Sequence, residues 1–449
     1  MTGWRRKARG ISRRTAGRLQ RLRRRSALLL LRWLLALRGR REHGERVRIR
    51  ILLQNAYGMG GTIRTALNLA GHLAARYDVE IVSVIRNVER PFFAFPPGVT
   101  VITADDRTVR RGPAARLLSR FPSVLTPRRD VTAPSVSLWT DLCLARTLWS
   151  GREHVLIGTK PVHNMLIAEV APRSVIKIGQ DHMNLTAYKP WLRAGIARSY
   201  PRLDLLTVLT RASLEAFAEL LGGERPRIVQ VPNAVPELNG GPADLDRKVI
   251  ITAGRLTWQK GYDMLVRAYA QVAPHHPDWE LRIFGSGPRH EQIKALIDEH
   301  DLHEHVRLMG RSTDLGVELA KASVCVLSSR FEGMPMVILE AMSKGLPTVA
   351  FDCPTGPAEL IAHEVNGLLV PPKDVDALAA TLRRIIADEE LRHRLGEQAR
   401  RAAEAYALPV IGARWEELIE EVTAPRRTGR RPADGRAASW RRGQRRATS

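Results

Sequence analysis

The sequence predicts an α/β protein with two doubly wound domains, each built on a parallel sheet. Short apolar segments typical of buried strands alternate with longer amphipathic segments, and this alternation stops at one linker and then restarts. A chain of 449 residues is also long enough for two or more hydrophobic cores. Two such domains facing each other are expected to form a central ligand cleft at the carboxyl ends of their strands.

The first domain is expected over residues 46–235. Its first strand, Val47–Leu53, is followed by a glycine-rich turn and a helix from Thr62 to about Arg76. The other segments with this alternating pattern are strands at Val79–Ile85, Val99–Thr103, His154–Gly158, Val175–Gly179, Thr207–Leu209 and Arg227–Val231, a helix around Leu138–Trp149 and a helix ending at Leu221.

Residues 236–247 are predicted to be a linker, because Pro, Gly, Asn and Asp dominate there. The second domain is expected over residues 248–407, with strands at Lys248–Gly254, Glu280–Gly287, Val306–Gly310, Ser323–Ser329 and Pro347–Phe351. The last helix, about Pro409–Val422, has no strand after it, which suggests that residues 408–424 pack back on the first domain.

The positive charge of the chain lies mainly in its two ends. Of the net charge of +25, residues 1–41 carry +15 and residues 425–449 carry +8, which leaves +2 for the residues between them. Residues 1–45 are therefore expected to be a basic amphipathic tail and residues 425–449 a disordered basic tail. The nearly neutral body argues against a nucleic-acid-binding protein.

The N-terminal tail has the pattern of a helix lying in a membrane surface. Its apolar run Ala27–Leu37 is shorter than the ~20 residues that span a bilayer, and the flanking basic residues do not fit a cleaved signal peptide. One stripe holds Arg14, Arg18, Arg21, Arg25 and Arg32, and Leu22, Leu29, Trp33 and Leu37 fall largely on another side. Residues 14–37 are thus predicted to contact an anionic membrane, which implies a cytoplasmic protein that is peripheral on the inner face. The alternatives are a disordered basic arm, or residues upstream of the true start.

Three cysteines, Cys143, Cys325 and Cys353, lie far apart and form no C-x-x-C pair. Their spacing argues for a reducing compartment and against a disulfide framework or a structural zinc site. Each is expected to be a small buried side chain.

A glycine-rich turn follows the first strand, in the stretch YGMGGTIRT. It matches neither the dinucleotide-binding fingerprint nor a Walker A loop. Gly60 and Gly61 would allow backbone amides to approach an anion at the start of the following helix. A tight packing turn is the alternative.

Two cations and a histidine lie just after predicted strands. Arg255 and Lys260 together could neutralise a diphosphate without a metal ion, although a solvated charged loop is the alternative. His182 also follows a strand, so it is either a site residue or a structural histidine.

Two glutamates bracket the apolar stretch MPMVIL. Glu332 is expected in the loop after the strand Ser323–Ser329, and Glu340 on the second turn of the next helix. Gly333 and the amides near Met336 and Ile338 would add an anion site at the start of that helix. The alternative is that Glu332 only complements the helix dipole and Glu340 is solvated.

These motifs together resemble the retaining family 4 glycosyltransferases of the GT-B fold. The resemblance rests on E-x(7)-E at Glu332–Glu340, G-R-x(4)-K-G at Gly254–Gly261, the turn Gly58–Thr62 and VPNAV at 231–235, and it covers roughly residues 48–422. The segment Cys353–Pro357 resembles members that act on polymeric or lipid-linked envelope glycans. The implied fold is two Rossmann-like domains.

The resemblance implies a metal-independent transfer of a hexose-type sugar, with no cofactor, from a nucleotide-diphospho-sugar to a hydroxyl of an envelope glycan, a teichoic-acid-like polymer or a lipid-linked acceptor. Arg255 and Lys260 would bind the diphosphate, Glu340 the ribose and Glu332 the sugar. Gly60, Gly61, Gly333, Met336 and Ile338 would complete donor binding, and His182 would lie near the sugar.

Other functions remain open on sequence alone. A glycosidase would need two carboxylates flanking one bond and no diphosphate clamp, so the pair of Arg255 and Lys260 and the two-domain pattern argue against it. A metal-dependent D-x-D transferase is disfavoured, because Asp244–Asp246 lies in the linker and Asp374–Asp376 opens a surface helix. The alternatives carried forward are a sugar-nucleotide epimerase on the same fold and a membrane-binding or nucleic-acid-binding adaptor with an inactive core.

Overall fold

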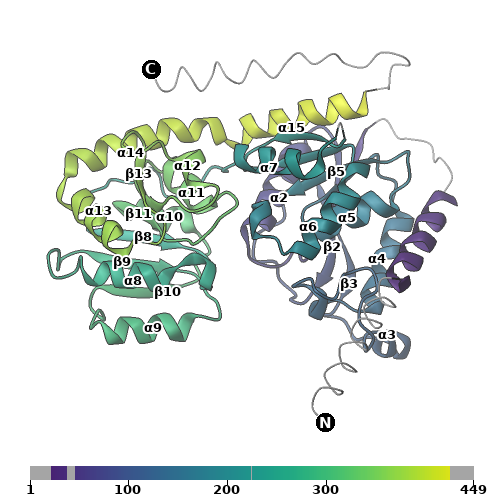
Figure 1. Ribbon diagram of the computed structural model, residues 1–449, viewed down its shortest axis with the longest axis horizontal. Coiled ribbons are helices and arrows are strands. Elements are labelled where there is room, and N and C mark those ends of the chain that lie inside the picture. Colours follow the sequence, from purple (N-terminus) through teal and green to yellow (C-terminus); the bar gives the residue numbers. More distant parts are fainter. Residues whose placement is uncertain (1–21, 38–45, 224, 425–449) are drawn as a thin grey trace, which may run out of the picture. The chain divides into compact units, whose positions relative to one another are not determined.

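The computed structural model describes residues 22–37, 46–223 and 225–424 (Figure 1). The chain divides into two compact units, with the boundary between Ala234 and Val235. Each unit contains one sheet in which all the paired strands are parallel. The predicted α/β class with two Rossmann-like sheets is therefore confirmed.

Among the described residues, the sheet of the first unit has the strand order β3-β2-β1-β4-β5-β6-β7. Its strands are β1 (Arg48–Leu53), β2 (Asp78–Arg86), β3 (Val99–Asp106), β4 (Val155–Gly158), β5 (Ile176–Asp181), β6 (Leu205–Val208) and β7 (Arg227–Gln230). Its helices are α2 (Gly61–Leu73), α3 (Pro113–Leu118), α4 (Leu138–Ser150), α5 (Pro161–Val170), α6 (Pro190–Ser199) and α7 (Arg211–Leu221), with 3₁₀ turns η1 (Ala133–Ser135), η2 (Leu185–Ala187) and η3 (Tyr200–Arg202).

The described sheet of the second unit has the order β10-β9-β8-β11-β12-β13. Its strands are β8 (Val249–Ala253), β9 (Glu280–Phe284), β10 (Val306–Gly310), β11 (Val324–Leu327), β12 (Thr348–Phe351) and β13 (Gly367–Val370). Its helices are α8 (Tyr262–Ala270), α9 (His290–Glu299), α10 (Leu315–Ala320), α11 (Met336–Ser343), α12 (Pro357–Leu360), α13 (Val375–Ala387), α14 (Glu389–Ala403) and α15 (Leu408–Thr423), with 3₁₀ turns η4 (Trp258–Lys260) and η5 (Glu404–Tyr406).

The sequence prediction missed several short elements. Strand β13 was not predicted, and neither were helices α3, α5 and α6. Four-residue strands and helices of six to ten residues are too short for a hydrophobic period to be distinctive. The contact of α15 with the first unit stays a prediction.

Strand order reverses once in each sheet, between β1 and β4 in the first and between β8 and β11 in the second. At such a switch point the connections leave the two neighbouring strands towards opposite faces, so a crevice opens at the carboxyl ends of the strands. The loops after β1, β4, β8 and β11 are therefore the places where each unit is built to bind a ligand.

The linker is held by the second unit. Lys344, at the end of α11, is buried, and its ammonium donates to the carbonyl oxygens of Leu238, Asn239 and Gly241 at 2.7, 2.7 and 2.8 Å. A Cβ on Gly316 of α10 would lie 2.7 Å from the Asn239 carbonyl oxygen. The linker thus lies close against α10 and α11.

Residues 22–37 form a helix that docks on the first unit. Leu28, Leu31 and Leu35 are only 6, 6 and 2% exposed and join its hydrophobic core. Arg24 Nε donates to the Leu125 carbonyl oxygen at 3.0 Å, and its guanidinium lies 3.8 Å from the carboxylate of Glu169. The prediction of a basic tail missed this docking. Residues 1–21, 38–45 and 425–449 lie outside the described residues, and with them Arg14, Arg18 and Arg21 of the predicted basic stripe.

In the described part of the chain, no helix combines the length and the hydropathy needed to cross a bilayer. This result matches the prediction that the apolar run at 27–37 is too short to span a membrane.

We expect Leu31→Ala to lower the free energy of unfolding of the first unit by about 2–5 kcal/mol, because it leaves a cavity where the helix meets the core. Leu29→Ala is the matched control: Leu29 is 60% exposed on the same helix, so the change should stay within about 0.5 kcal/mol. Urea unfolding of the full chain measures both. Equal effects of the two substitutions would mean that the helix does not dock through Leu31.

Candidate functional site

The two motifs of the second unit meet at the switch point between β8 and β11. Lys260, in the loop after β8, donates from its ammonium to Glu332 Oε1 at 2.6 Å. The Ser329 hydroxyl donates to the same oxygen, also at 2.6 Å. Glu332 is only 6% exposed, so its charge is balanced by a buried ion pair and a hydrogen bond. The structure thus brings together residues that are 72 positions apart.

Glycine at position 261 makes this meeting possible. Gly261 has a φ of 65°, in the left-handed region, and a Cβ there would overlap the carbonyl oxygen of Ser328. The Ser328 hydroxyl donates to the Lys260 carbonyl oxygen at 3.0 Å. The backbone of the loop after β8 therefore lies directly on the loop after β11, and any side chain at residue 261 would force the two loops apart.

Arg330 reinforces the same junction. Its guanidinium makes a two-pronged contact with the Asp263 carboxylate at 2.8 and 2.6 Å and lies 4.8 Å from the centre of the Trp258 ring. Its amide donates to the Gln259 carbonyl oxygen at 2.7 Å, and the Gln259 side chain donates to the Phe331 carbonyl oxygen at 3.0 Å. These contacts fix the positions of Lys260 and Glu332 before any ligand arrives.

The loop after β12 supports Glu332 from another side. The Glu332 amide donates to the Pro354 carbonyl oxygen at 3.3 Å, and the Thr355 hydroxyl donates to the Glu332 carbonyl oxygen at 2.8 Å. Burial, followed by the nearby charge of Glu332, raises the pKa of the Cys353 thiol to about 12. Cys353 is thus a buried, protonated side chain, as predicted, and the segment Cys353–Pro357 has a structural role beside Glu332.

Glu340 lies on α11 and is only 3% exposed, which excludes the alternative that it is solvated. Burial, and to a lesser extent the charge of Glu340, raises the pKa of the Cys325 thiol to about 12. At the start of the same helix, the Ile338 amide donates to the Pro335 carbonyl oxygen at 3.1 Å. That amide is therefore used within the first turn, which weakens its predicted role in binding an anion, whereas Gly333 and Met336 lie at the entrance to the helix.

Arg255 is exposed and lies two residues after β8, at the carboxyl end of the strand. The loop after β9 packs against the backbone on either side of Arg255 through two glycines that were not predicted as site residues. A Cβ on Gly285 would overlap the Gly254 carbonyl oxygen, and a Cβ on Gly287 would overlap that of Leu256. The pattern Gly-Ser-Gly after a buried strand was the available signal.

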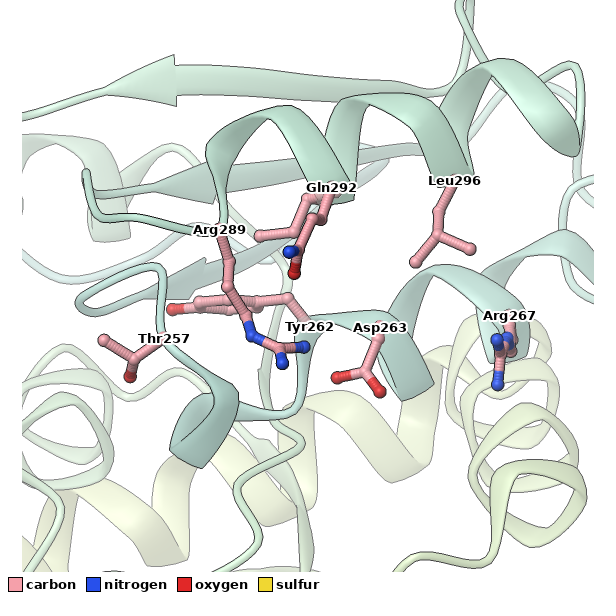
Figure 2. Close-up of a pocket in the computed structure, with 8 residues that line it drawn as sticks. Thr257, Tyr262, Asp263, Arg267, Arg289, Gln292 and Leu296 are labelled. Atoms are coloured by element: carbon pink, nitrogen blue, oxygen red, sulfur yellow. The ribbon is translucent and has the colours of Figure 1, made fainter.

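A pocket opens beside this loop, between η4, α8 and α9 (Figure 2). Its lining includes Thr257, Tyr262, Asp263 and Arg289. A Cβ on Gly254 would lie 3.0 Å from both Tyr262 Oη and Lys260 Cε, so a pocket residue and the lysine of the ion pair both pack against this glycine. Burial raises the pKa of the Tyr262 hydroxyl, which is therefore neutral. Arg289 adds a cation that the sequence analysis did not name.

The first unit presents its own candidate residues at the β1–β4 switch point. Gly60 precedes α2, no side chain caps the start of that helix, and a Cβ on Gly60 would meet nothing within 4 Å. Gly61 is the first residue of α2. The turn is thus open at Gly60, which fits an anion site better than a tight packing turn.

Lys160 is a further cation at this edge and was missed by the sequence analysis. It follows β4, and its ammonium donates to Gln54 Oε1 at 2.6 Å and to Thr132 Oγ1 at 3.0 Å. Burial lowers its pKa to about 8, so the side chain stays mostly protonated at neutral pH. Its position two residues after the buried strand His154–Gly158 was the signal that could have identified it.

His182 follows β5 at the same edge of the sheet. Burial lowers its pKa to about 4, so the ring is neutral at physiological pH. Its Nε2 is buried and has no hydrogen-bond partner among the described residues. A neutral ring with an unsatisfied nitrogen can donate to or accept from a ligand hydroxyl, whereas a structural histidine would normally be satisfied.

The preceding residue, Asp181, is a buried carboxyl. It accepts hydrogen bonds from the hydroxyls of Tyr188 and Tyr200 at 2.5 and 3.1 Å, and burial raises its pKa to about 7. Burial and the neighbouring carboxyl also raise the pKa of both tyrosines, so their hydroxyls stay protonated. This cluster fixes the backbone on which His182 is mounted.

Within the described ranges, one group of potential metal-binding side chains lies close enough together to share an ion: Asp246, Glu389 and His393. All three are exposed. In the other D-x-D pattern, Asp374 accepts from the Ala377 amide at 2.9 Å and caps α13, as predicted. Neither group belongs to the switch points.

We expect Asp181→Asn to stabilise the protein increasingly as the pH rises from about 4 to about 7. The folded-state pKa of Asp181 is raised from 3.8 to about 7, so its contribution to stability is complete below the unfolded pKa and is lost as the pH rises through 7. Asparagine cannot ionise; its one carbonyl oxygen can still accept from one tyrosine, and its amide nitrogen can donate to the hydroxyl oxygen of the other. Thermal unfolding of both proteins across this pH range checks the prediction, and a stability difference that does not depend on pH would contradict it.

The model of the protein family described as "Glycosyl transferases group 1" matches residues 238–402 of this chain. The chain is 37% identical over 404 residues to an exopolysaccharide phosphotransferase of Streptomyces coelicolor, covering 86% of this chain but only 42% of that relative. It is 31% identical over 379 residues to the amylovoran biosynthesis glycosyltransferase AmsD of Erwinia amylovora, covering 82% of this chain and 98% of the relative.

A solved structure shows the same fold. The sucrose-phosphate synthase of Thermosynechococcus elongatus superposes with a TM-score of 0.69 at 19% identity, over 84% of this chain and 99% of that one. This likeness extends over both units, and the sequence match to AmsD extends over nearly the whole of that enzyme. The chain therefore belongs to the group 1 glycosyltransferases and has their GT-B fold.

Proposed function

We propose that this glycosyltransferase belongs to retaining family 4 and moves a hexose-type sugar from a nucleotide-diphospho-sugar to a hydroxyl of an envelope polysaccharide, a teichoic-acid-like polymer or a lipid-linked acceptor. The proposal rests above all on the ion pair between Lys260 and Glu332, which places a cation and a buried carboxylate together at a switch point. A donor with a charged diphosphate beside a polar sugar requires these two kinds of group next to each other.

The donor would bind to the second unit. A lysine ammonium has three N–H donors, and Lys260 uses one of them on Glu332. The other donors, together with the exposed guanidinium of Arg255, would neutralise the diphosphate. Glu340 would accept hydrogen bonds from the vicinal hydroxyls of the ribose, and Gly333 and Met336 would approach the phosphates with their backbones. In the first unit, the residues proposed to contact a ligand are Gly60, Gly61 and His182.

The transfer itself would need no nucleophile from the enzyme. The acceptor oxygen forms its bond to the anomeric carbon on the face from which the diphosphate leaves, so the configuration is retained. The bond from the anomeric carbon to the diphosphate oxygen breaks with both electrons going to that oxygen, which then takes the proton of the acceptor hydroxyl. Lys260 and Arg255 would stabilise the charge on the leaving group, and in this scheme no metal ion is needed.

The proposed acceptor and location follow from two further observations. The relatives named above are an exopolysaccharide phosphotransferase and an enzyme of amylovoran biosynthesis, which favours a polysaccharide acceptor of the cell envelope. The basic and apolar pattern of residues 14–37 favours peripheral attachment on the cytoplasmic face of the membrane. An enzyme held at that surface would meet a lipid-linked acceptor at a raised effective concentration.

We expect Arg255→Ala and Glu340→Ala each to weaken nucleotide-sugar binding by about 1.5–3 kcal/mol, because each removes a charge-assisted contact. Calorimetric titration with a panel of nucleotide sugars, after a thermal-shift screen to find the donor, measures the loss. Arg400→Ala, an exposed change on α14 of the same unit, is the control and should bind normally. Wild-type affinity in folded Arg255 and Glu340 variants would remove both residues from the site.

Glu332→Gln should lower turnover more than donor affinity. Glutamine keeps the shape and can still accept from Ser329 and Lys260, but it removes the negative charge beside the transferred sugar. Steady-state rates and direct titration of the donor separate the two effects. An equal loss of affinity for the free nucleoside diphosphate would show instead that Glu332 acts only by positioning Lys260.

A further inference from the structure

We propose that helix 22–37 and the arginine-rich segment 107–131 of the first unit together form one docking face for an anionic lipid surface. This inference deepens the proposed membrane contact of residues 14–37 and rests on it. It makes the contact a property of the folded first unit and adds a segment that lies about 70 residues further along the chain.

Helix 22–37 has two apolar faces on opposite sides. Leu28, Leu31 and Leu35 form the face that is buried in the first unit. The opposite face is exposed, with Leu29 at 60% and Trp33 at 59%, and the other large apolar side chains on it are Leu22, Leu30 and Leu37. An exposed stripe of four leucines and a tryptophan is far more than a solvated helix face normally carries.

Arginines flank the exposed stripe on both sides. With 3.6 residues per turn, Arg25 and Arg32 lie along one edge of the stripe and Arg23 along the other, and all three are exposed. Arginines at these positions can extend towards lipid headgroups while the leucines and Trp33 enter the boundary of the acyl chains. Because the buried leucines hold the helix on the first unit, the stripe faces in a fixed direction from that unit.

Segment 107–131 has the same combination of residues. It carries seven arginines and a single acidic residue, Asp130. Arg107 and Arg111 bind the buried Asp105 and are structural, whereas Arg110, Arg116, Arg120, Arg128 and Arg129 are exposed. Exposed apolar side chains lie among them, namely Val109, Leu117, Phe121 and Val131. No regular period marks this segment in the sequence, so it was not predicted as a basic surface.

The two segments are joined in the fold. The hydrogen bond from Arg24 to the Leu125 carbonyl oxygen connects them directly, and Leu125 shares a core cluster with Leu28, Leu31 and Leu35. The Val124 and Leu125 amides and the Ser123 hydroxyl donate to the Asp141 carboxylate on α4. In Figure 1 the helix of residues 22–37, in purple, and α3 both lie close to α4. Helix α4 adds the exposed residues Leu142, Arg146 and Trp149.

The charge of this face selects an anionic lipid surface as its partner. Apart from the half-buried Asp130, every charged side chain in residues 22–37 and 107–131 is an arginine. Exposed arginines mixed with leucine and aromatic side chains match a bilayer interface, in which headgroup charge lies directly above hydrocarbon. A polyanion without hydrocarbon would leave the apolar stripe in water.

The test is flotation of the full chain with phosphatidylcholine vesicles that contain or lack phosphatidylglycerol, at two salt concentrations. Arg116→Gln/Arg120→Gln changes segment 107–131, and Leu29→Gln/Trp33→Gln changes the helix stripe; all four side chains are exposed. We expect each of these two double variants to bind the anionic vesicles more weakly than the wild type by a factor of about ten or more. Binding by the wild type should also be more sensitive to salt than binding by the variants. Lys294→Gln/Arg400→Gln removes two exposed cations of the second unit and should bind normally.

A second measurement does not depend on how the double variants fold. Brominated lipids should quench the tryptophan fluorescence of the wild-type chain, and Trp33→Phe should remove part of that quenching. If Arg116→Gln/Arg120→Gln binds vesicles as the wild type does and only Leu29→Gln/Trp33→Gln loses binding, the joint docking face is overturned. The membrane contact of helix 22–37 would then still hold.

Wild-type vesicle binding in both double variants would overturn the joint docking face and also the membrane contact of helix 22–37. If the wild-type chain does not bind vesicles but forms an oligomer that dissociates in the variants, the face contacts a second copy of the chain and the lipid proposal is overturned. DNA binding that is weaker in Arg116→Gln/Arg120→Gln but unchanged in Leu29→Gln/Trp33→Gln would also overturn the lipid proposal. Transfer to a short soluble acceptor should stay unchanged throughout, so the proposed chemistry is tested separately.

Discussion

The close approach of two loops at Gly261 and Ser328 controls the arrangement of the second unit. Because residue 261 has no side chain, the loop after β8 rests on the loop after β11, and Lys260 reaches Glu332 at 2.6 Å. Burying a carboxylate is costly unless it is paired and hydrogen-bonded, and here both conditions are met by Lys260 and Ser329. The contacts of Arg330 with Asp263 and Trp258 then hold the pair in one geometry. Glycine at one position thus sets where the charges of the site lie.

Both units place their unusual charged groups at the carboxyl ends of parallel strands, although the groups differ. In the second unit the cation Lys260 is paired with a carboxylate, which suits a ligand that brings its own negative charge. In the first unit, burial shifts the pKa values of Asp181, His182 and Lys160 towards the neutral forms, although Lys160 stays mostly protonated at neutral pH. Desolvation is the common cause, and groups tuned in this way are frequent at functional sites. Burial thus favours the neutral forms of Asp181 and His182 in the first unit, whereas Lys260 and Glu332 balance each other as an ion pair in the second.

Helix 22–37 connects the stability of the first unit with its surface properties. Removing residues 1–41 would delete the exposed apolar stripe of the helix, but it would also uncover the core that Leu28, Leu31 and Leu35 complete. A truncated chain could lose activity for either reason, so substitutions of exposed residues such as Leu29 and Trp33 are the more informative change. The same helix explains why so apolar a segment occurs in a chain whose described helices do not span a bilayer: one face belongs to the protein core and the other faces outward.

Local sequence patterns were enough to predict the strand and helix alternation, the linker and the spacing of Arg255, Lys260, Glu332 and Glu340, because short-range periodicity and glycine-rich turns are local properties. They could not show that Lys260 pairs with Glu332, since 72 residues separate them and only the sheet order brings them together. Lys160 and the glycines after β9 were missed although each follows a predicted strand, because a position after a strand does not show which groups the residue contacts. Helix 22–37 shows the limit most clearly: both of its faces are apolar, and a hydrophobic pattern cannot say which face meets the core. The tertiary structure decided that, because only the face with Leu28, Leu31 and Leu35 finds a matching core on the first unit.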